Sequence, residues 1–305
     1  MELKKALSGV VKAAFDAQLT EFSQIGGGVA GGMVYRTVLD KSPFVVAIKT
    51  TKDKDLLEKE CKYIKYIQQY TDIKLPEIYF DTTIDNQYFV VMEYFDAVNC
   101  LSDFVLEASE ENRQKVAQQI ADNIIKLQSV KGEKYGDLLS PEFDNWHDYY
   151  KPFVKTVKRE ADVLQKEGYI TKHILDYVNK AYENYDVIFD EPVSKPTIIH
   201  GDYWAANILV NKNYELAGVL DPFNCMWGDS EYELFALNAA HNGKIPVLEA
   251  FLAKQTVSRK FMLKNYFYFL FSEVYWVTKL HHDNNDYLNE IISNLDAEMK
   301  RFNII

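Results

Sequence analysis

The chain contains the stretch His200-Gly201-Asp202-Tyr203-Trp204-Ala205-Ala206-Asn207, and Asp221 follows it in Val219-Leu220-Asp221-Pro222. Asp202 is the acidic side chain of the first stretch, and it can accept the proton of a hydroxyl nucleophile. Asn207 and Asp221 supply the amide and carboxylate oxygens that can hold magnesium against a triphosphate. An Asp, an Asn five residues later and a second Asp further on are the side chains that phosphoryl transfer from ATP requires.

The residues around these side chains predict a β-hairpin. Ile208–Val210 has the apolar pattern of a short strand, Tyr214–Leu220 that of a returning strand, and a polar turn separates them. Asn207 and Asp221 therefore flank one hairpin and are expected to lie close enough to share a metal ion. Taken alone, the segment is also compatible with ordinary turn chemistry, so the interpretation depends on what lies upstream.

A glycine-rich turn is predicted between strands at Phe22–Ile25 and Met33–Leu39. It places five of the 13 glycines of the chain within seven positions. Residues without side chains let backbone amides approach phosphate groups closely, which makes Gly27 and Gly28 candidates for ATP binding. The turn does not have the spacing of a phosphate-binding loop of known type, and a flexible hairpin without a ligand is the alternative.

The next predicted strand, Phe44–Lys49, ends on a lysine. The sequence Val46-Ala47-Ile48-Lys49 has the arrangement in which a strand lysine binds the α- and β-phosphates of ATP. The alternative for Lys49 is a lysine at a strand end that faces solvent.

The segment Asp53–Tyr70 predicts a helix with one apolar face. Glu60 lies on the side of Ile64 and Ile67, so it is the candidate partner of Lys49 in the ATP site. Glu58 is the competing candidate, but it lies about 160° away on the helical wheel.

Two further strands, Glu77–Thr83 and Tyr88–Glu93, complete a predicted five-stranded antiparallel sheet with one helix. The connector that follows, from Glu93 to Phe95, offers backbone groups to an adenine ring. We therefore expect a small nucleotide-binding lobe at residues 1–97, which includes a leading helix, and a catalytic and acceptor-binding lobe at residues 98–305.

The larger lobe is predicted to be mostly helical, because its segments show helical periodicity. Aromatic side chains beside carboxylates suit an amino sugar, whose apolar face stacks on rings while carboxylates hold its ammonium groups. The predicted helices are Glu110–Val130, Trp146–Glu167, Thr171–Ile188, Glu231–Asn242, Thr256–Leu280 and Tyr287–Phe302, and the candidate acceptor-binding residues are Tyr203, Trp204, Trp227, Asp229 and Glu231.

With these segments in one order, the chain resembles the aminoglycoside phosphotransferase and fructosamine kinase superfamily of small-molecule kinases. The resemblance is carried by His200–Asn207, in which a glycine replaces the arginine of protein kinases, by Asp221-Pro222, and by Trp227-Gly228-Asp229-Ser230-Glu231-Tyr232-Glu233-Leu234. The resemblance to fructosamine kinases is greatest in His200–Trp204, in Asp221-Pro222 and in the last of these segments. Glu233 stands where many aminoglycoside kinases have aspartate.

The resemblance implies a two-lobed α+β fold of the protein-kinase type and a phosphotransferase that uses ATP and Mg²⁺. It implies phosphorylation of a hydroxyl on a small, amine-bearing molecule of the aminoglycoside or fructosamine type, with Asp202 as the catalytic residue. Choline-like and thiosugar kinases are alternatives within this class, and a nucleotide-binding pseudokinase that acts as an interaction module is the alternative outside it. A Rossmann-type dinucleotide binder is excluded because a strand, not a helix, follows the glycine turn.

Composition limits the partners. The net charge of −11 over 305 residues disfavours nucleic acid and favours a cationic acceptor. Cys61, Cys100 and Cys225 lie far apart, which predicts buried free thiols in a reducing cytoplasm. Tyr266–Phe271 is too short for a membrane span, and Met1–Phe15 predicts an amphipathic helix rather than a signal peptide.

Overall fold

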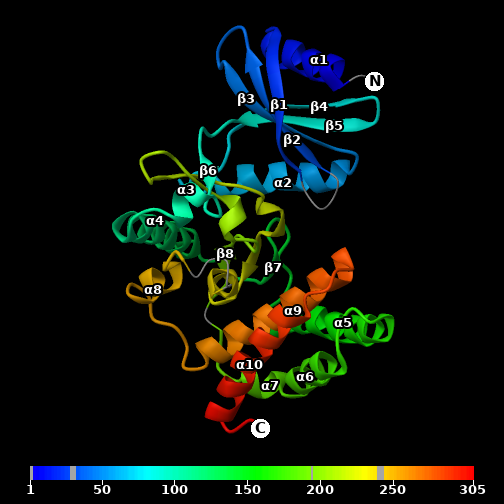
Figure 1. Cartoon of the computed structure of the whole chain (residues 1–305), viewed down its shortest axis with the longest axis vertical. Helices are drawn as coiled ribbons and strands as arrows, with labels where there is room; N and C mark the ends of the chain where they lie inside the picture. The colour runs from blue at the N-terminus through cyan, green and yellow to red at the C-terminus, as the bar shows by residue number, and fades with distance from the viewer. Residues whose placement is uncertain (1–2, 28–31, 194, 239–243) are drawn as a thin grey trace. The chain divides into compact units, whose positions relative to one another are not determined.

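The computed structural model describes residues 3–27, 32–193, 195–238 and 244–305 (Figure 1). The chain forms two compact units. The first comprises residues 1–119 and 205–224, and the second comprises residues 120–204 and 225–305. Each unit is described by itself.

The first unit contains a five-stranded sheet in which every pair of neighbours is antiparallel, as the sequence predicts. The strand order is β1-β2-β3-β5-β4. Short turns join β2 to β3 and β4 to β5, and a helix, α2, lies between β3 and β4 in the sequence. The elements are α1 (Leu3–Phe15), β1 (Leu19–Gly27), β2 (Met33–Leu39), β3 (Val45–Thr51), α2 (Lys54–Ile67), β4 (Ile78–Ile84) and β5 (Gln87–Glu93).

The two helices pack on opposite faces of this sheet, because side chains alternate along each strand. Val46 and Ile48 of β3 pack in the cluster that contains the buried face of α1. Ala47 packs with Leu57 and Cys61 of α2. Lys49, two residues after Ala47, therefore lies on the face that α2 covers.

A second, three-stranded sheet of the first unit has the order β10-β9-β6. The predicted returning strand is shorter than expected, because the Asn211 side chain accepts the N–H groups of Asn213 and Glu215 and extends the turn. Tyr214 has a positive φ of 57° within that turn. The elements here are β6 (Val98–Asn99), α3 (Asp103–Leu106), the 3₁₀ helix η1 (Ala205–Asn207), β9 (Ile208–Val210), β10 (Leu216–Val219) and the 3₁₀ helix η2 (Pro222–Asn224).

The second unit is mostly helical and holds a small sheet of order β7-β11-β8. Its core lies between the long helices and is rich in aromatic rings. In that core Trp146 stacks on Tyr150 with centroids 5.2 Å apart. The elements are β7 (Gly136–Asp137), α5 (Trp146–Glu167), α6 (Lys172–Glu183), α7 (Tyr185–Ile188), β8 (Thr197–Ile199), β11 (Met226–Gly228), the 3₁₀ helix η3 (Tyr232–Asn238), α8 (Val247–Leu252), α9 (Phe261–Leu280) and α10 (Asn285–Arg301), while α4 (Glu110–Ser129) contains the boundary between the units.

Three predicted helices differ from the structure. The segment 171–188 forms two helices, because Asn184 ends α6 and precedes α7. The segment predicted from Glu231 is a 3₁₀ helix as far as Asn238, and residues 239–243 lie outside the described residues. Helix α9 begins at Phe261 instead of Thr256, since the Ser258 N–H upstream donates to the Glu231 side chain. No helix among the described residues is long and apolar enough to cross a membrane.

Candidate active site

Lys49 lies between two carboxylates in the first unit. Its Nζ donates to both oxygens of Glu60, at 2.8 and 3.0 Å, and also contacts Asp221. Glu58 instead pairs with Lys54, at 3.2 Å. Burial disfavours the charge on Lys49, but the Glu60 and Asp221 carboxylates outweigh burial, so the pKa of Lys49 is raised. Of the two candidate glutamates, the structure therefore brings Glu60 to Lys49.

Glu60 is held in place by the apolar face of α2. Leu57, Cys61 and Ile64 are buried on this helix, and Glu60 is only 4% exposed. A buried carboxylate is costly unless it is paired, and Lys49 supplies the pairing cation. Burial of this face of α2 thus directs the Glu60 carboxylate toward Lys49 of β3.

Asn207 and Asp221 flank the β9–β10 hairpin in the same unit. The Leu220 N–H donates to the Asn207 carbonyl at 2.8 Å, which ties the two ends of the hairpin together. Asp221 has a positive φ of 58°, a conformation that Asp tolerates better than most residues. Among the described residues, no group of three or more His, Cys, Asp or Glu side chains is arranged to hold a metal by itself.

The connector after β5 packs against the same hairpin. A Cβ added to Gly218 of β10 would lie 2.5 Å from the Phe95 ring, so only glycine permits this close approach. Glu93 exchanges hydrogen bonds with Glu77, donating its N–H at 2.8 Å and accepting at its carboxylate at 3.3 Å. The geometry fixes the connector, and the adenine contact of Glu93 and Phe95 stays a prediction.

The glycine turn is described only in part. Gly27 is the last residue of β1 and pairs with Met33 of β2. Gly28 lies outside the described residues. Phosphate binding by both glycines stays a prediction.

The loop of residues 200–204 carries Asp202 and is called the catalytic loop after its predicted role. It belongs to the second unit, where it directly follows β8. Gly201 has a positive φ of 75°, which explains the glycine before Asp202. The Glu233 carboxylate of η3 accepts the backbone N–H groups of His200 and, at 3.2 Å, of Gly201. Asp202 is thereby presented from a loop whose backbone is anchored on a buried side chain.

The sequence alone predicts no specific role for Glu233. It is 2% exposed, and burial raises its pKa to about 8, an effect that its two backbone donors oppose and the Asp202 carboxylate increases. Its signal in the sequence is the acidic residue of Tyr232-Glu233-Leu234, part of the segment that carries the family resemblance. What it contacts could be learned only from the tertiary structure.

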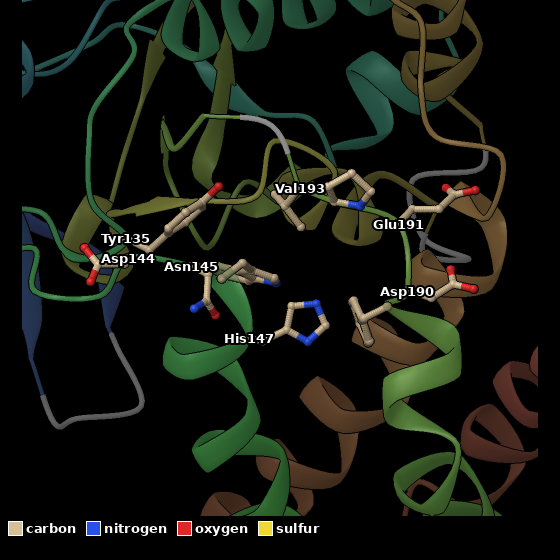
Figure 2. Close-up of a pocket in the computed structure, with 10 residues that line it drawn as sticks. Tyr135, Asp144, Asn145, His147, Asp190, Glu191 and Val193 are labelled. Atoms are coloured by element: carbon tan, nitrogen blue, oxygen red, sulfur yellow. The ribbon is translucent and has the colours of Figure 1, made fainter.

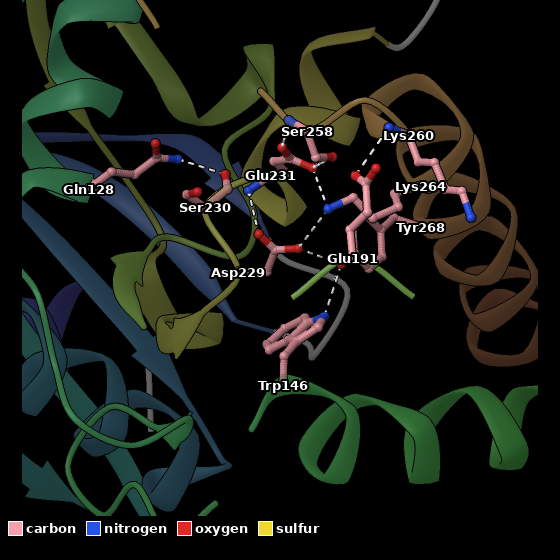
Figure 3. A network of polar contacts seen from close by, with 10 residues as sticks. All are labelled: Gln128, Trp146, Glu191, Asp229, Ser230, Glu231, Ser258, Lys260, Lys264 and Tyr268. Atoms are coloured by element: carbon pink, nitrogen blue, oxygen red, sulfur yellow. Dashed lines mark hydrogen bonds and ion pairs between the residues drawn. The ribbon is translucent and has the colours of Figure 1, made fainter. Parts of the chain in front are cut away.

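The candidate acceptor residues are mostly interior. Tyr203 is fully buried and donates its hydroxyl to Asn123 at 2.7 Å, and Trp227 donates its ring N–H to the Leu138 carbonyl at 3.1 Å. Asp229 and Glu231 belong to a buried polar network (Figure 3). Trp204 is half-buried against the core of the second unit. Acceptor binding by these five residues stays a prediction, and the buried contacts of four of them favour a supporting role.

A cavity of about 270 Å³ lies beside the first turn of α5 (Figure 2). Its acidic lining residues already have partners: Asp190 pairs with Lys260 at 2.7 Å, and Glu191 accepts from Arg259. None of the sequence-predicted site residues lines this cavity. The lining residues are Tyr135, Asp144, Asn145, Trp146, His147, Phe189, Asp190, Glu191, Pro192 and Val193.

Comparison with known proteins gives consistent results. The sequence model of the phosphotransferase enzyme family matches residues 21–259 of the chain. A chloroplastic protein-ribulosamine 3-kinase from Oryza sativa subsp. japonica is 25% identical over 228 residues, which are 71% of this chain and 61% of that protein. The chain thus spans less than two thirds of the length of the curated relatives that it matches.

The fold of this chain is also found in solved structures, for example in the two that follow. A protein from Haemophilus somnus assigned as a fructosamine-3-kinase superposes with a TM-score of 0.69 at 13% identity, covering 96% of both chains. A thermostable mutant of aminoglycoside phosphotransferase APH(4)-Ia, in a ternary complex with AMP-PNP and hygromycin B, gives a TM-score of 0.66 at 13% identity and covers 97% of this chain and 98% of that one. At these identities the likeness concerns the fold.

Proposed function

The chain belongs to the phosphotransferase enzyme family, and we propose that it transfers the γ-phosphoryl group of ATP to a hydroxyl of a small, amine-bearing molecule. The observation that carries this proposal is the contact of Lys49 with both Glu60 and Asp221. Phosphoryl transfer depends on positioning and on stabilising negative charge, and this cluster would supply one cation and one carboxylate ligand for a metal.

The nucleotide half of the site would bind ATP through the first unit. Lys49, held by Glu60, would contact the α- and β-phosphates. Asn207 and Asp221 offer one amide and one carboxylate oxygen, a donor set that suits Mg²⁺ when phosphate and water oxygens complete its shell. The bound ion would neutralise charge on the phosphates. Backbone groups between Glu93 and Phe95 would contact adenine.

Asp202 would orient the acceptor hydroxyl and take its proton as the oxygen attacks the γ-phosphorus, with ADP as the leaving group. The placement of its carboxylate matters more than its basicity. That placement is supported by Glu233, which holds the two peptide N–H groups immediately before Asp202.

We expect Glu60→Gln to weaken ATP binding about 10-fold, because Lys49 loses its buried charged partner and a charge-assisted hydrogen bond contributes roughly 1.5–3 kcal/mol. The loss should be equal with and without magnesium. Isothermal titration with ATP measures it. The matched control is Glu58→Gln, two residues away and paired with Lys54, which should bind ATP like the wild type. Equal losses in both variants would contradict the assignment of Glu60.

The acceptor is proposed to be a ketosamine or an amino sugar. Two observations support an amine: the matched rice relatives act on ribulosamines, as their names state, and the net charge of the chain is −11. The APH(4)-Ia complex contains an aminoglycoside, which is also amine-bearing. Choline-like and thiosugar acceptors are the alternatives within the same chemistry. Buried free thiols at Cys61, Cys100 and Cys225 fit the proposed cytoplasmic location.

An ATP-consumption screen tests the acceptor class. We expect turnover with fructosyl- or ribosyl-amines or with aminoglycosides, and none with neutral sugars. Fructosyl-lysine and kanamycin separate the two branches, since each carries the amine in a different scaffold. Turnover with neutral or anionic acceptors alone would contradict the charge argument. ATP binding without turnover of any acceptor would favour a nucleotide-binding pseudokinase.

A further inference from the structure

A buried lysine of α9, Lys264, lies between two carboxylates of the segment that follows β11 (Figure 3). Its Nζ pairs with Glu231 and lies 3.6 Å from an oxygen of Asp229. The side chains of Lys264, Asp229 and Glu231 are 4%, 3% and 11% exposed. Burial disfavours the charge on Lys264, but the two carboxylates outweigh it and raise the pKa of the lysine. The three groups thus form an ion cluster inside the second unit.

The same carboxylates hold other parts of the unit. Asp229 accepts from the Glu231 N–H at 3.0 Å and from the Tyr268 hydroxyl at 2.9 Å, and that hydroxyl accepts the Trp146 ring N–H at 2.9 Å. Glu231 accepts the N–H and, at 2.8 Å, the hydroxyl of Ser258. An acceptor amine could reach these oxygens only by displacing protein donors.

The segment held by this cluster contacts the catalytic loop through the side chain of Glu233. The Gln128 side chain donates to the Ser230 carbonyl at 2.8 Å. Two residues after Glu231, the Glu233 carboxylate accepts the backbone N–H groups of the two residues before Asp202. A displacement of the segment would therefore move Glu233 and, through it, the loop that carries Asp202.

We propose that Lys264 is a positioning residue for the catalytic loop, and that Asp229 and Glu231 support this loop instead of binding the acceptor amine. The proposal rests on the proposed function, in which Asp202 is the catalytic residue. It replaces the role that the sequence suggested for the two carboxylates with one that their burial and their partners support. Lys264 acts on the reaction through Glu233 and touches no reacting atom.

Lys264→Met tests the positioning role. We expect kcat to fall about 100-fold, because small displacements of catalytic groups have effects of this size. The Kd for ATP and the KM for the acceptor should stay near the wild-type values. Hydrogen exchange at the His200 and Gly201 amides should become faster. Since two buried carboxylates lose their cation, Tm should also fall, so assays are run well below the Tm of the variant.

Lys260→Met is the matched control. Lys260 is a second buried lysine, directly before α9, with a side chain 5% exposed. Its Nζ donates to Asp190 at 2.7 Å and to the Val187 carbonyl at 2.6 Å, and among the described residues it forms no hydrogen bond or ion pair with residues 229–233. This variant should lose stability but keep its kcat and its exchange at His200 and Gly201. If both variants lost kcat in equal measure, Lys264 would have no role beyond stability and the proposal would be overturned.

A charge-compensated variant separates support from acceptor binding. The combination Asp229→Asn, Glu231→Gln and Lys264→Met removes one cation and two anions and leaves no uncompensated ionised group in the cluster. We expect its Tm and kcat to recover relative to Lys264→Met, with an unchanged KM for an amine-bearing acceptor. A rise of about 10-fold or more in that KM, without such a rise in Lys264→Met, which keeps both carboxylates, would show that the carboxylates bind the amine and would overturn the proposal.

Failure of the proposed function would look different. If the wild-type protein phosphorylated no acceptor, the proposed function would fail, but hydrogen exchange would still decide the role of the cluster. Faster exchange at His200 and Gly201 in Lys264→Met, but not in Lys260→Met, supports the positioning role. Unchanged exchange in Lys264→Met overturns it.

Discussion

Asp202→Asn should lower turnover about 1,000-fold while the affinity for Mg²⁺ and ATP stays at the wild-type value. Asparagine has nearly the same shape as aspartate, but it cannot take the proton of the acceptor hydroxyl. The backbone anchor on Glu233 involves the two residues before Asp202 and does not need the carboxylate. Steady-state kinetics with the best acceptor of the screen and isothermal titration with Mg²⁺ and ATP measure the two quantities.

Asp162→Asn is the control for this substitution. Asp162 lies on α5 in the same unit and forms a surface ion pair with Lys158 at 3.3 Å, so its loss should leave turnover unchanged. An Asp202→Asn enzyme that keeps most of its turnover would remove Asp202 from the catalytic role. A parallel loss of ATP binding would indicate that the substitution disturbed the nucleotide site instead.

The contact of Lys49 with Glu60 was predictable from the sequence, because the signals for it are local. Strand alternation in β3 places Lys49 on the side of Ala47, and the helical spacing of Glu60 with Ile64 places Glu60 on the buried face of α2. Both patterns act over a few residues, so burial fixes the direction of each side chain. The contact of Lys49 with Glu60 follows from the two patterns together.

The supporting contacts of the catalytic loop could not be predicted, because they join residues far apart in the sequence. Glu233 reaches the backbone of His200, and Lys264 pairs with carboxylates on a segment before its own helix. Lys264 lies between apolar and aromatic residues of α9, a pattern that indicates burial but no partner. Tertiary packing alone identifies such pairs.

The helix predicted from Glu231 is wrong for the same reason. The segment after Glu231 has helical periodicity, but Asp229 accepts the Glu231 N–H and the Glu233 side chain is directed to the catalytic loop. The described part of this segment becomes a 3₁₀ helix in which side-chain contacts compete with regular helical hydrogen bonding. Periodicity reports burial of a face, and it does not report this competition.

Asp221→Asn should abolish the part of the ATP-dependent stabilisation that requires magnesium. In the wild type, ligand at 100 times its Kd stabilises the folded state by about 2.7 kcal/mol, which is measurable as a rise in Tm. Asp221 is the one carboxylate beside Asn207 in the proposed Mg²⁺ site, and hard cations prefer charged oxygen ligands. We therefore expect the variant to respond to ATP equally with magnesium and with a chelator, and to lose turnover about 1,000-fold.

Because Asp221 also pairs with Lys49, the controls must separate loss of the metal ligand from disturbance of the lysine. Asp221→Asn also removes one of the two carboxylates at Lys49, but Glu60 remains at 2.8 Å to hold the lysine. Glu60→Gln should therefore keep the magnesium increment at a lower ATP affinity, whereas Asp221→Asn should lose the increment alone. Asp55→Asn, an exposed position in the first turn of α2, should behave like the wild type. Of the three variants, Asp221→Asn alone removes a ligand of the proposed Mg²⁺ site. If the magnesium-dependent part of the stabilisation persisted in this variant, the metal would bind to other residues.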